Sequence, residues 1–139
     1  NEKPIVIPDQ FHQLQNLESL SIYCNESHSE VDLSQCKSLK YLSINGYIPN
    51  YKNGIPALEE LQIQCKSQTL PPFIFKCLHV KKLTIENRVI THMEDHFHRL
   101  QHLTVLQLRT NALEEFPESI REVRTLKELG LYSNKIQSV

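Results

Sequence analysis

Aliphatic residues recur along the chain at fixed spacings, with one such residue followed by others three and five positions later. Six stretches carry this pattern: LESLSIYCN from Leu17, LKYLSINGY from Leu39, LEELQIQCK from Leu58, VKKLTIENR from Val80, LTVLQLRTN from Leu103 and LKELGLYSN from Leu126. Their starts are 22, 19, 22, 23 and 23 residues apart. Apolar and polar residues alternate at the end of each stretch, which predicts a short strand with one buried face. We therefore expect six strands built from one internal repeat.

The segments that precede the strands share a second pattern. In segments 7–17, 70–80, 93–103 and 116–126, apolar residues stand ten, six and three positions before the residue that opens the strand. A spacing of three suits a 3-10 or irregular helix. One repeat cannot bury its apolar side alone, but stacked repeats form a continuous core. The two patterns together predict a curved coil with a parallel sheet inside the curve and the connectors outside.

The combined pattern, L-x-x-L-x-L-x-x-N-x-L-x-x-L-P-x-x-I-x-x-L, resembles that of the leucine-rich repeat family over residues 7–139. The 22–23-residue form with P-x-x-I resembles the short repeats of many bacterial and Ras-suppressor-like members. The resemblance implies an α/β fold: a right-handed leucine-rich-repeat solenoid with a concave parallel sheet of about six strands and 3-10 or irregular-helical convex connectors.

We expect one domain over residues 1–139, with repeats starting near 17, 39, 58, 80, 103 and 126. Residues 1–16 are expected to cap the first repeat. The chain stops at NKIQSV, where Val139 aligns with Phe116 of the repeat before, so we expect a missing C-terminal cap. An uncapped solenoid end leaves apolar core and strand edge open. Homo-oligomers formed through this end are therefore one expectation.

The ninth position of the repeat departs from the family in the middle of the chain. In the family an Asn there bonds the backbone of neighbouring turns, and this chain has Asn25, Asn111 and Asn134. The three middle repeats carry Tyr47, Lys66 and Arg88 instead. We expect a stable C-terminal half and a less regular middle, with Tyr47 to Gly54 as the most mobile loop.

Composition excludes several functional classes. The chain has 15 basic and 16 acidic side chains, and a net charge of -1 argues against a dedicated nucleic-acid binder. No apolar run of about 18 residues is present, so we expect no membrane span. With only 3 glycines the chain carries no Gly-rich phosphate motif, and it also lacks H-E-x-x-H and G-x-S-x-G. We expect no cofactor.

Four histidines fall within THMEDHFHRLQH, residues 91–102. His92 and His96 are four apart, as are His98 and His102, but on a helix the two pairs would point in different directions. Structural zinc needs four converging ligands, so we predict a solvated outer face and no intramolecular metal site. His92 and His96 remain the weak surface candidates for a metal shared between molecules. His79 is expected to lie about 5 Å from His102 at the backbone, because both precede neighbouring strands.

The four cysteines are predicted to be free thiols. Cys36 and Cys77 fall at connector core positions, where they replace aliphatic residues and should be buried. Cys24 and Cys65 lie two repeats apart, and two ladder steps of roughly 4.8 Å exceed the reach of a disulfide. A nucleophile made of Cys77 with a nearby histidine is an alternative, but burial of the thiol argues against it.

Strand residues between the inward aliphatic ones should face the hollow of the curve in three ladders, one for each polar position of the strand. In this family the hollow generally binds other proteins, and Tyr and Arg are frequent at binding hot spots. The alternative is that mixed polar residues only keep the sheet soluble. The candidate partner-binding residues are Tyr23, Tyr41, Asn45, Glu60, Lys82, Glu86, Arg109 and Tyr132.

The leading hypothesis is a non-catalytic protein–protein interaction module that binds a partner protein on its concave face. The short repeats favour a bacterial effector or surface protein that engages a host protein, cytoplasmic or secreted from a bacterium. The alternative is the substrate-recognition part of a larger enzyme, such as a bacterial ubiquitin ligase. A zinc-dependent hydrolase built on the histidines is a third reading, and it lacks a general base and a pocket.

Overall fold

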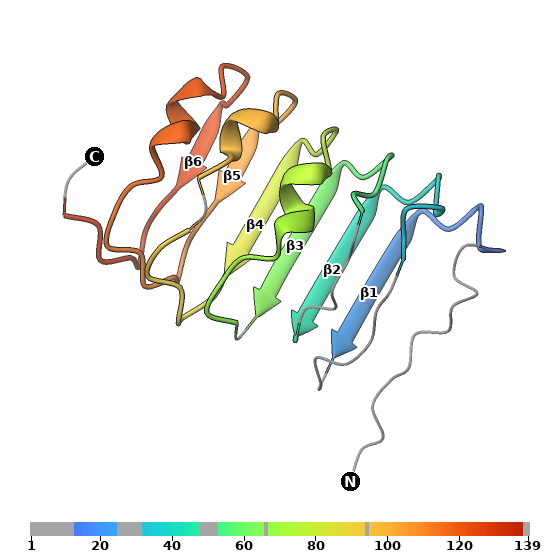
Figure 1. The fold of residues 1–139 in the computed structure, drawn as a ribbon, viewed down its shortest axis with the longest axis horizontal. Helices are drawn as coiled ribbons and strands as arrows, with labels where there is room; N and C mark the ends of the chain where they lie inside the picture. Colours follow the sequence, from blue (N-terminus) through green and yellow to red (C-terminus); the bar gives the residue numbers. More distant parts are fainter. Residues whose placement is uncertain (1–12, 25–31, 48–52, 66, 94, 138–139) are drawn as a thin grey trace, which may run out of the picture.

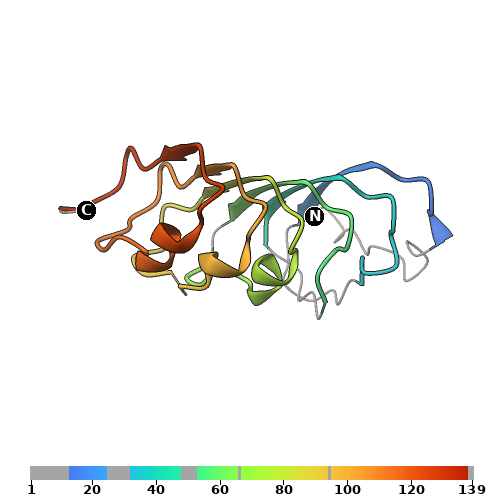
Figure 2. The ribbon, with the colours of Figure 1, turned by 90° about the horizontal axis from the view of Figure 1, so that it is seen from above.

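The structure, a computed structural model, describes residues 13–24, 32–47, 53–65, 67–93 and 95–137. Six strands form one parallel sheet in chain order: β1 (Ser19–Cys24), β2 (Tyr41–Gly46), β3 (Glu60–Cys65), β4 (Lys82–Glu86), β5 (Val105–Gln107) and β6 (Glu128–Gly130). Three 3-10 helices lie in the connectors: η2 (Pro72–Lys76), η3 (Phe97–Arg99) and η4 (Glu118–Glu122). The sheet runs along one side of the molecule and the 3-10 helices along the other (Figures 1 and 2).

Strand register follows the repeat, because a shift by one residue would turn the aliphatic side chains out of the core. Leu42 pairs with Leu61, Leu61 with Leu83, and Leu83 with Leu106. All four are fully buried. The predicted six-stranded parallel sheet with 3-10 connectors is thus confirmed.

Connector side chains fill the space behind the sheet. Phe97 and Leu100 are fully buried and Met93 is partly buried, as the repeat pattern predicts. Phe97 and Phe75 pack edge to face with ring centroids 5.2 Å apart, and this contact joins η2 to η3. Pro71 and Pro117 immediately precede η2 and η4, where their fixed φ suits a helix start.

Gly54 allows two neighbouring repeats to approach closely. A Cβ at this position would lie 2.1 Å from the backbone oxygen of Lys76. The contact brings the short connector before β3 against the end of η2. The loop from Tyr47 to Gly54 was predicted to be the most mobile, and residues 48–52 of this loop lie outside the described residues.

Strand length runs opposite to the expectation of a less regular middle. Strands β1, β2 and β3 have 6 residues each and β4 has 5, whereas β5 and β6 have 3 each. After these two short strands, Asn111 and Asn134 bond the backbone of the turn through the carbonyls of Arg109 and Leu131. The greater stability of the C-terminal half stays a prediction.

The core is more exposed at the last described repeat. Leu129 of β6 is 38% exposed, whereas its equivalents in β2 to β5 are at 0%. Among the described residues no strand pairs with β6 on its outer side. Pairing of two molecules through this end also stays a prediction.

Candidate functional site

The eight residues singled out from the sequence lie on the exposed face of the sheet. Lys82 is exposed, and Tyr23 and Tyr132 reach 53% and 58% exposure. The predicted ladders hold in the strand pairing, where Tyr41 pairs with Glu60 and Glu60 with Lys82. The ladder formed by the third polar position of each repeat, near the ends of the strands, is called the third ladder. It consists of Tyr23, Asn45, Gln64, Glu86, Arg109 and Tyr132.

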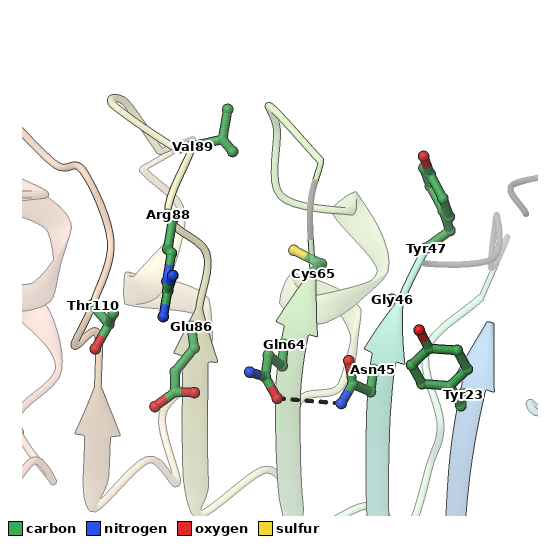
Figure 3. Close-up of a pocket in the computed structure, with 10 residues that line it drawn as sticks. All are labelled: Tyr23, Asn45, Gly46, Tyr47, Gln64, Cys65, Glu86, Arg88, Val89 and Thr110. Carbon is green, nitrogen blue, oxygen red and sulfur yellow. Dashed lines mark hydrogen bonds between the residues drawn. The ribbon is translucent and has the colours of Figure 1, made fainter. Parts of the chain in front are cut away.

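Hydrogen bonds and ion pairs join neighbouring rungs over β2, β3 and β4. The hydroxyl of Tyr41 donates to Oε1 of Gln62 at 3.4 Å. The amide of Asn45 donates to Oε1 of Gln64 at 3.3 Å, and Figure 3 shows this bond between the two strands. Lys82 and Glu60 form an ion pair at 3.4 Å. Such exposed contacts contribute little to stability, but they orient the side chains before a partner arrives.

On the C-terminal half of the exposed sheet face, Arg109 contacts side chains of both neighbouring repeats. Its Nη1 donates to the hydroxyl of Tyr132 at 2.7 Å, and its Nε lies 3.6 Å from Oε1 of Glu86. The hydrogen bond to Tyr132 is the main cause that raises the pKa of Arg109 above its ordinary value, and Glu86 adds to it. The guanidinium is therefore a fixed positive charge at any physiological pH.

A broad basin lies over the middle and C-terminal strands, with a volume of about 750 Å³. The basin is deepened at Gly130, which has no side chain, and the side chain of Gln107 lies against this glycine. A Cβ at Gly130 would lie 1.8 Å from Oε1 of Gln107. Nε2 of Gln107 donates to Glu128 at 2.6 Å. Four of the predicted residues line this basin: Glu60, Lys82, Arg109 and Tyr132.

A second depression, which we call the rim hollow, lies where the strands end and has a volume of about 370 Å³. Three residues of the third ladder that the sequence analysis singled out line it: Tyr23, Asn45 and Glu86. Seven other lining residues were not predicted as site residues: Gly46, Tyr47, Gln64, Cys65, Arg88, Val89 and Thr110. Figure 3 shows Tyr47 and Val89 beyond the strand ends and Cys65 at the end of β3, above the row of Tyr23, Asn45, Gln64 and Glu86.

The turns after β2, β5 and β6 have a left-handed residue at the eighth position of the repeat. Gly46, Thr110 and Ser133 all have positive φ there, at 98°, 58° and 61°. The turn lets Asn111 and Asn134 point inward at the ninth position. Nδ2 of Asn111 donates to the carbonyl of Ile85 at 3.0 Å, and Nδ2 of Asn134 donates to that of Leu108. The predicted backbone-bonding role is confirmed for these two, and Asn25 lies outside the described residues.

The fourth repeat corrects the expectation that it lacks this asparagine. Asn87 stands one position earlier than the family pattern and is 1% exposed. Its Nδ2 donates to the carbonyl of Ser67 and to Sγ of Cys65, and its Oδ1 accepts from the backbone N–H of Val89 at 2.9 Å. The repeat pattern did not reveal the role of Asn87, because this asparagine is displaced by one residue from the position where the pattern places it.

The histidines spread over the connector side. The 3-10 segment there covers only Phe97–Arg99, so neither His92 with His96 nor His98 with His102 is placed on a helix. His79 and His102 stack at 5.3 Å between ring centroids, in line with their expected closeness, and His96 packs against Phe75. Among the residues that the structure describes, no three potential ligands gather closely enough to hold a metal ion.

Cys36, Cys65 and Cys77 are buried thiols that form no disulfide, which confirms the predicted absence of disulfides for these three and the predicted burial of Cys36 and Cys77. The side chain of Cys24 lies outside the described set. Burial raises the pKa of the Cys77 thiol from 9.0 to about 11, and a hydrogen bond from the backbone of Ile55 opposes this shift. Burial likewise raises the pKa of Cys36 and of Cys65. A buried thiol with a raised pKa is a poor nucleophile.

Cys77 gives the protein a specific alkaline sensitivity. The folded thiol holds its proton more tightly than the unfolded one, so its contribution to stability is complete below pH 9 and is lost as the pH rises towards about 11. We expect the free energy of unfolding to fall by about 2 kcal/mol more in the native protein than in Cys77→Val between about pH 8 and 10.5. Urea unfolding of both proteins at the two pH values measures the difference, and parallel pH profiles would contradict it.

No helix among the described residues is long and apolar enough to cross a membrane. The sequence pattern of the family described as "Leucine rich repeat" matches residues 78–136. The structure is similar over 96% of the chain to a Leptospira interrogans LRR protein, with a TM-score of 0.69 and 18% identity. The chain has the fold of a leucine-rich-repeat solenoid, and residues 78–136 match the leucine-rich-repeat family. An internalin from Listeria monocytogenes is also similar in structure, over 97% of the chain with a TM-score of 0.52 and 18% identity.

Two curated relatives are volume-regulated anion channel subunits. The protein is 31% identical over 83 residues to LRRC8D of Rattus norvegicus and 30% identical over 91 residues to LRRC8E of Xenopus tropicalis. These matches cover 58% and 63% of the chain. The chain spans only 10% and 11% of these relatives, and 42% and 47% of the two solved structures.

Proposed function

We propose that this protein binds a partner protein through the exposed face of its sheet, with the basin around Arg109 at the centre of the contact. The observation that carries the proposal is the row of aromatic and charged side chains that cross-strand contacts already hold in place. Tyr and Arg are common at interface hot spots, and pre-ordered side chains lose less entropy on binding. The mixture of Glu60, Lys82, Glu86 and Arg109 adds a charge pattern that a partner can complement.

The proposed module acts as a scaffold without chemistry of its own. Leucine-rich repeats generally serve as binding surfaces, and the sheet face offers contact area along its whole length. The thiol of Cys77, which a nucleophilic mechanism would need, is buried and has its pKa raised to about 11. A protein-binding role uses the exposed residues as they stand.

Replacing Tyr41 and Arg109 together with alanine should weaken binding of a cognate partner at least about tenfold. Tyr41 stands on β2 and Arg109 follows β5, so the double variant tests two separate parts of the face. The biotinylated protein is used to capture and identify a partner, and the affinity of the purified partner is then measured by interferometry. The matched control replaces His92 and Arg99, which are both exposed on the connector side.

An equal loss of affinity in the control pair would place the binding surface on the connectors. Unchanged affinity in the Tyr41 and Arg109 variant would contradict the proposed face directly. Thermal unfolding of each variant checks that the fold is retained.

A bacterial surface or effector role is the second candidate. The Leptospira and Listeria structures support it, because both are bacterial proteins with the same fold over nearly the whole chain. Binding of the purified protein to intact host cells, lost in the Tyr41 and Arg109 variant but not in the control, is the expected result. Failure of the native protein to bind host cells would count against this role, and binding that both variants retain would place the contact outside the sheet face.

A further inference from the structure

The ninth position of the repeat is used in two opposite ways along the chain. Asn111 is 6% exposed there and bonds the backbone of the neighbouring repeat. In the second and fourth repeats the same position carries Tyr47, which is 44% exposed, and Arg88, which is also exposed. These two side chains line the rim hollow (Figure 3).

The fourth repeat keeps the buried amide and still frees its ninth position. Asn87 bonds the carbonyl of Ser67 and accepts the N–H of Val89, so the turn retains its internal hydrogen bonds. The backbone N–H of Asn87 in turn donates to Oδ1 of Asn111 at 2.7 Å. The displacement of the asparagine by one residue therefore leaves Arg88 available at the surface without loss of backbone hydrogen bonding in the turn.

Arg88 has no ion-pair partner within the described part of the chain. Glu86, the carboxylate of the hollow, pairs with Arg109 at 3.6 Å. No hydrogen bond or ion pair joins the Arg88 side chain to any residue that the structure describes. A guanidinium offers five N–H donors in a fork that matches a carboxylate. An uncompensated guanidinium at the edge of a hollow is suited to an anionic group.

The rest of the hollow is apolar and aromatic at its rim and polar at its floor. Tyr23, Tyr47 and Val89 are 53%, 44% and 45% exposed. The bonded amides of Asn45 and Gln64 lie between them on the sheet (Figure 3). The volume of about 370 Å³ is at the lower end of the usual range for ligand pockets, which runs from about 300 to 1,000 Å³. It fits one or two side chains of a bound segment.

From these contacts we infer that the rim hollow binds an acidic segment of the partner protein. One carboxylate of that segment pairs with Arg88, and a neighbouring aromatic or aliphatic side chain lies against Tyr47 and Val89. The inference rests on the proposed function, because the segment belongs to the protein bound on the sheet face. Arg88 is then a specificity-determining residue that selects an acidic segment over a basic one.

The test uses the whole chain and three short peptides of defined sequence. Acetyl-phenylalanyl-glutamate amide carries the required pair of groups, the glutamine peptide removes its charge, and the lysine peptide reverses it. Backbone amide shifts are followed by NMR up to about 5 mM peptide, where millimolar affinities are measurable. We expect the glutamate peptide alone to shift the amides of Tyr47, Arg88 and Val89.

The Arg88→Gln substitution should lower the affinity for the glutamate peptide by about fivefold, as expected for an exposed charge pair. Arg99→Gln is the matched control, because Arg99 is an exposed arginine on the connector side, and it should leave the affinity unchanged. Added salt should lower the affinity for the glutamate peptide, because it screens the charge pair, and should not change any residual affinity for the glutamine peptide.

Three results would overturn the inference: no shifts at the hollow, equal shifts with the glutamine peptide, or equal shifts with inorganic phosphate, which would indicate general anion binding. These results are distinct from failure of the proposed function. Loss of a cognate partner in the Tyr41 and Arg109 variant, with no peptide binding at the hollow, would support the sheet face and refute the role of Arg88.

Discussion

Replacing Phe97 with alanine is expected to lower the free energy of unfolding by about 3–5 kcal/mol. The ring is at 0% exposure, and its edge-to-face contact with Phe75 joins two neighbouring connectors. Truncation removes apolar burial and leaves a cavity that the stacked repeats cannot close without moving both 3-10 segments. Equilibrium unfolding in urea, followed by circular dichroism, measures the change.

Phe116 provides the matched control for this substitution. It occupies an aromatic connector position as well, but it is only partly buried, and the guanidinium of Arg121 lies 5.0 Å from its ring centre. Phe116→Ala should cost clearly less than Phe97→Ala because part of its surface already faces water. A loss below about 1 kcal/mol for Phe97→Ala would show that this contact does not hold the repeats together.

Replacing Asn111 with alanine should lower the free energy of unfolding by about 3 kcal/mol, since each orphaned buried group costs roughly 1–3 kcal/mol. Its Oδ1 accepts from the backbone N–H of Asn87 at 2.7 Å, and its Nδ2 donates to the carbonyls of Ile85 and Arg109 at 3.0 and 3.2 Å. The substitution leaves these backbone groups without partners inside the stack. Hydrogen exchange should show the loss of protection first at the amide of Asn87.

Asn45→Ala serves as the comparison. Asn45 is an exposed asparagine whose amide bonds, among the residues that the structure describes, only the side chain of Gln64, at 3.3 Å. Its removal should change the free energy of unfolding by less than about 0.5 kcal/mol. Equal effects of the two substitutions would contradict the view that the inward asparagines satisfy the buried backbone of the solenoid.

The spacing of aliphatic residues was sufficient to predict the sheet and its register. Because side chains alternate with a period of two, only one register buries Leu42, Leu61, Leu83 and Leu106 together. The ladders on the exposed face follow from the same alternation. Tyr41, Glu60 and Lys82 could therefore be placed side by side from the sequence, and the ion pair between Lys82 and Glu60 fits that placement.

The rim hollow could not be predicted in this way, because it forms where the strands end and the repeat pattern is broken. The sequence showed Tyr47 and Arg88 as departures from the asparagine position. Only the folded chain shows that Asn87 takes over the buried amide, and that Arg88 consequently reaches the surface. The outcome depends on which carbonyls of neighbouring repeats lie within reach, and these come from residues about 20 positions away.

What the sequence alone determined is the periodic part of this protein: the parallel sheet, its register, the buried aliphatic column and the polar ladders. These features depend on alternation along a single strand, which can be read directly from the order of residues. What only the tertiary structure decided is the turn chemistry and the combination of Tyr47, Arg88 and Val89 around one hollow. Such features depend on φ values at single turns and on contacts between repeats, which no spacing along the chain specifies.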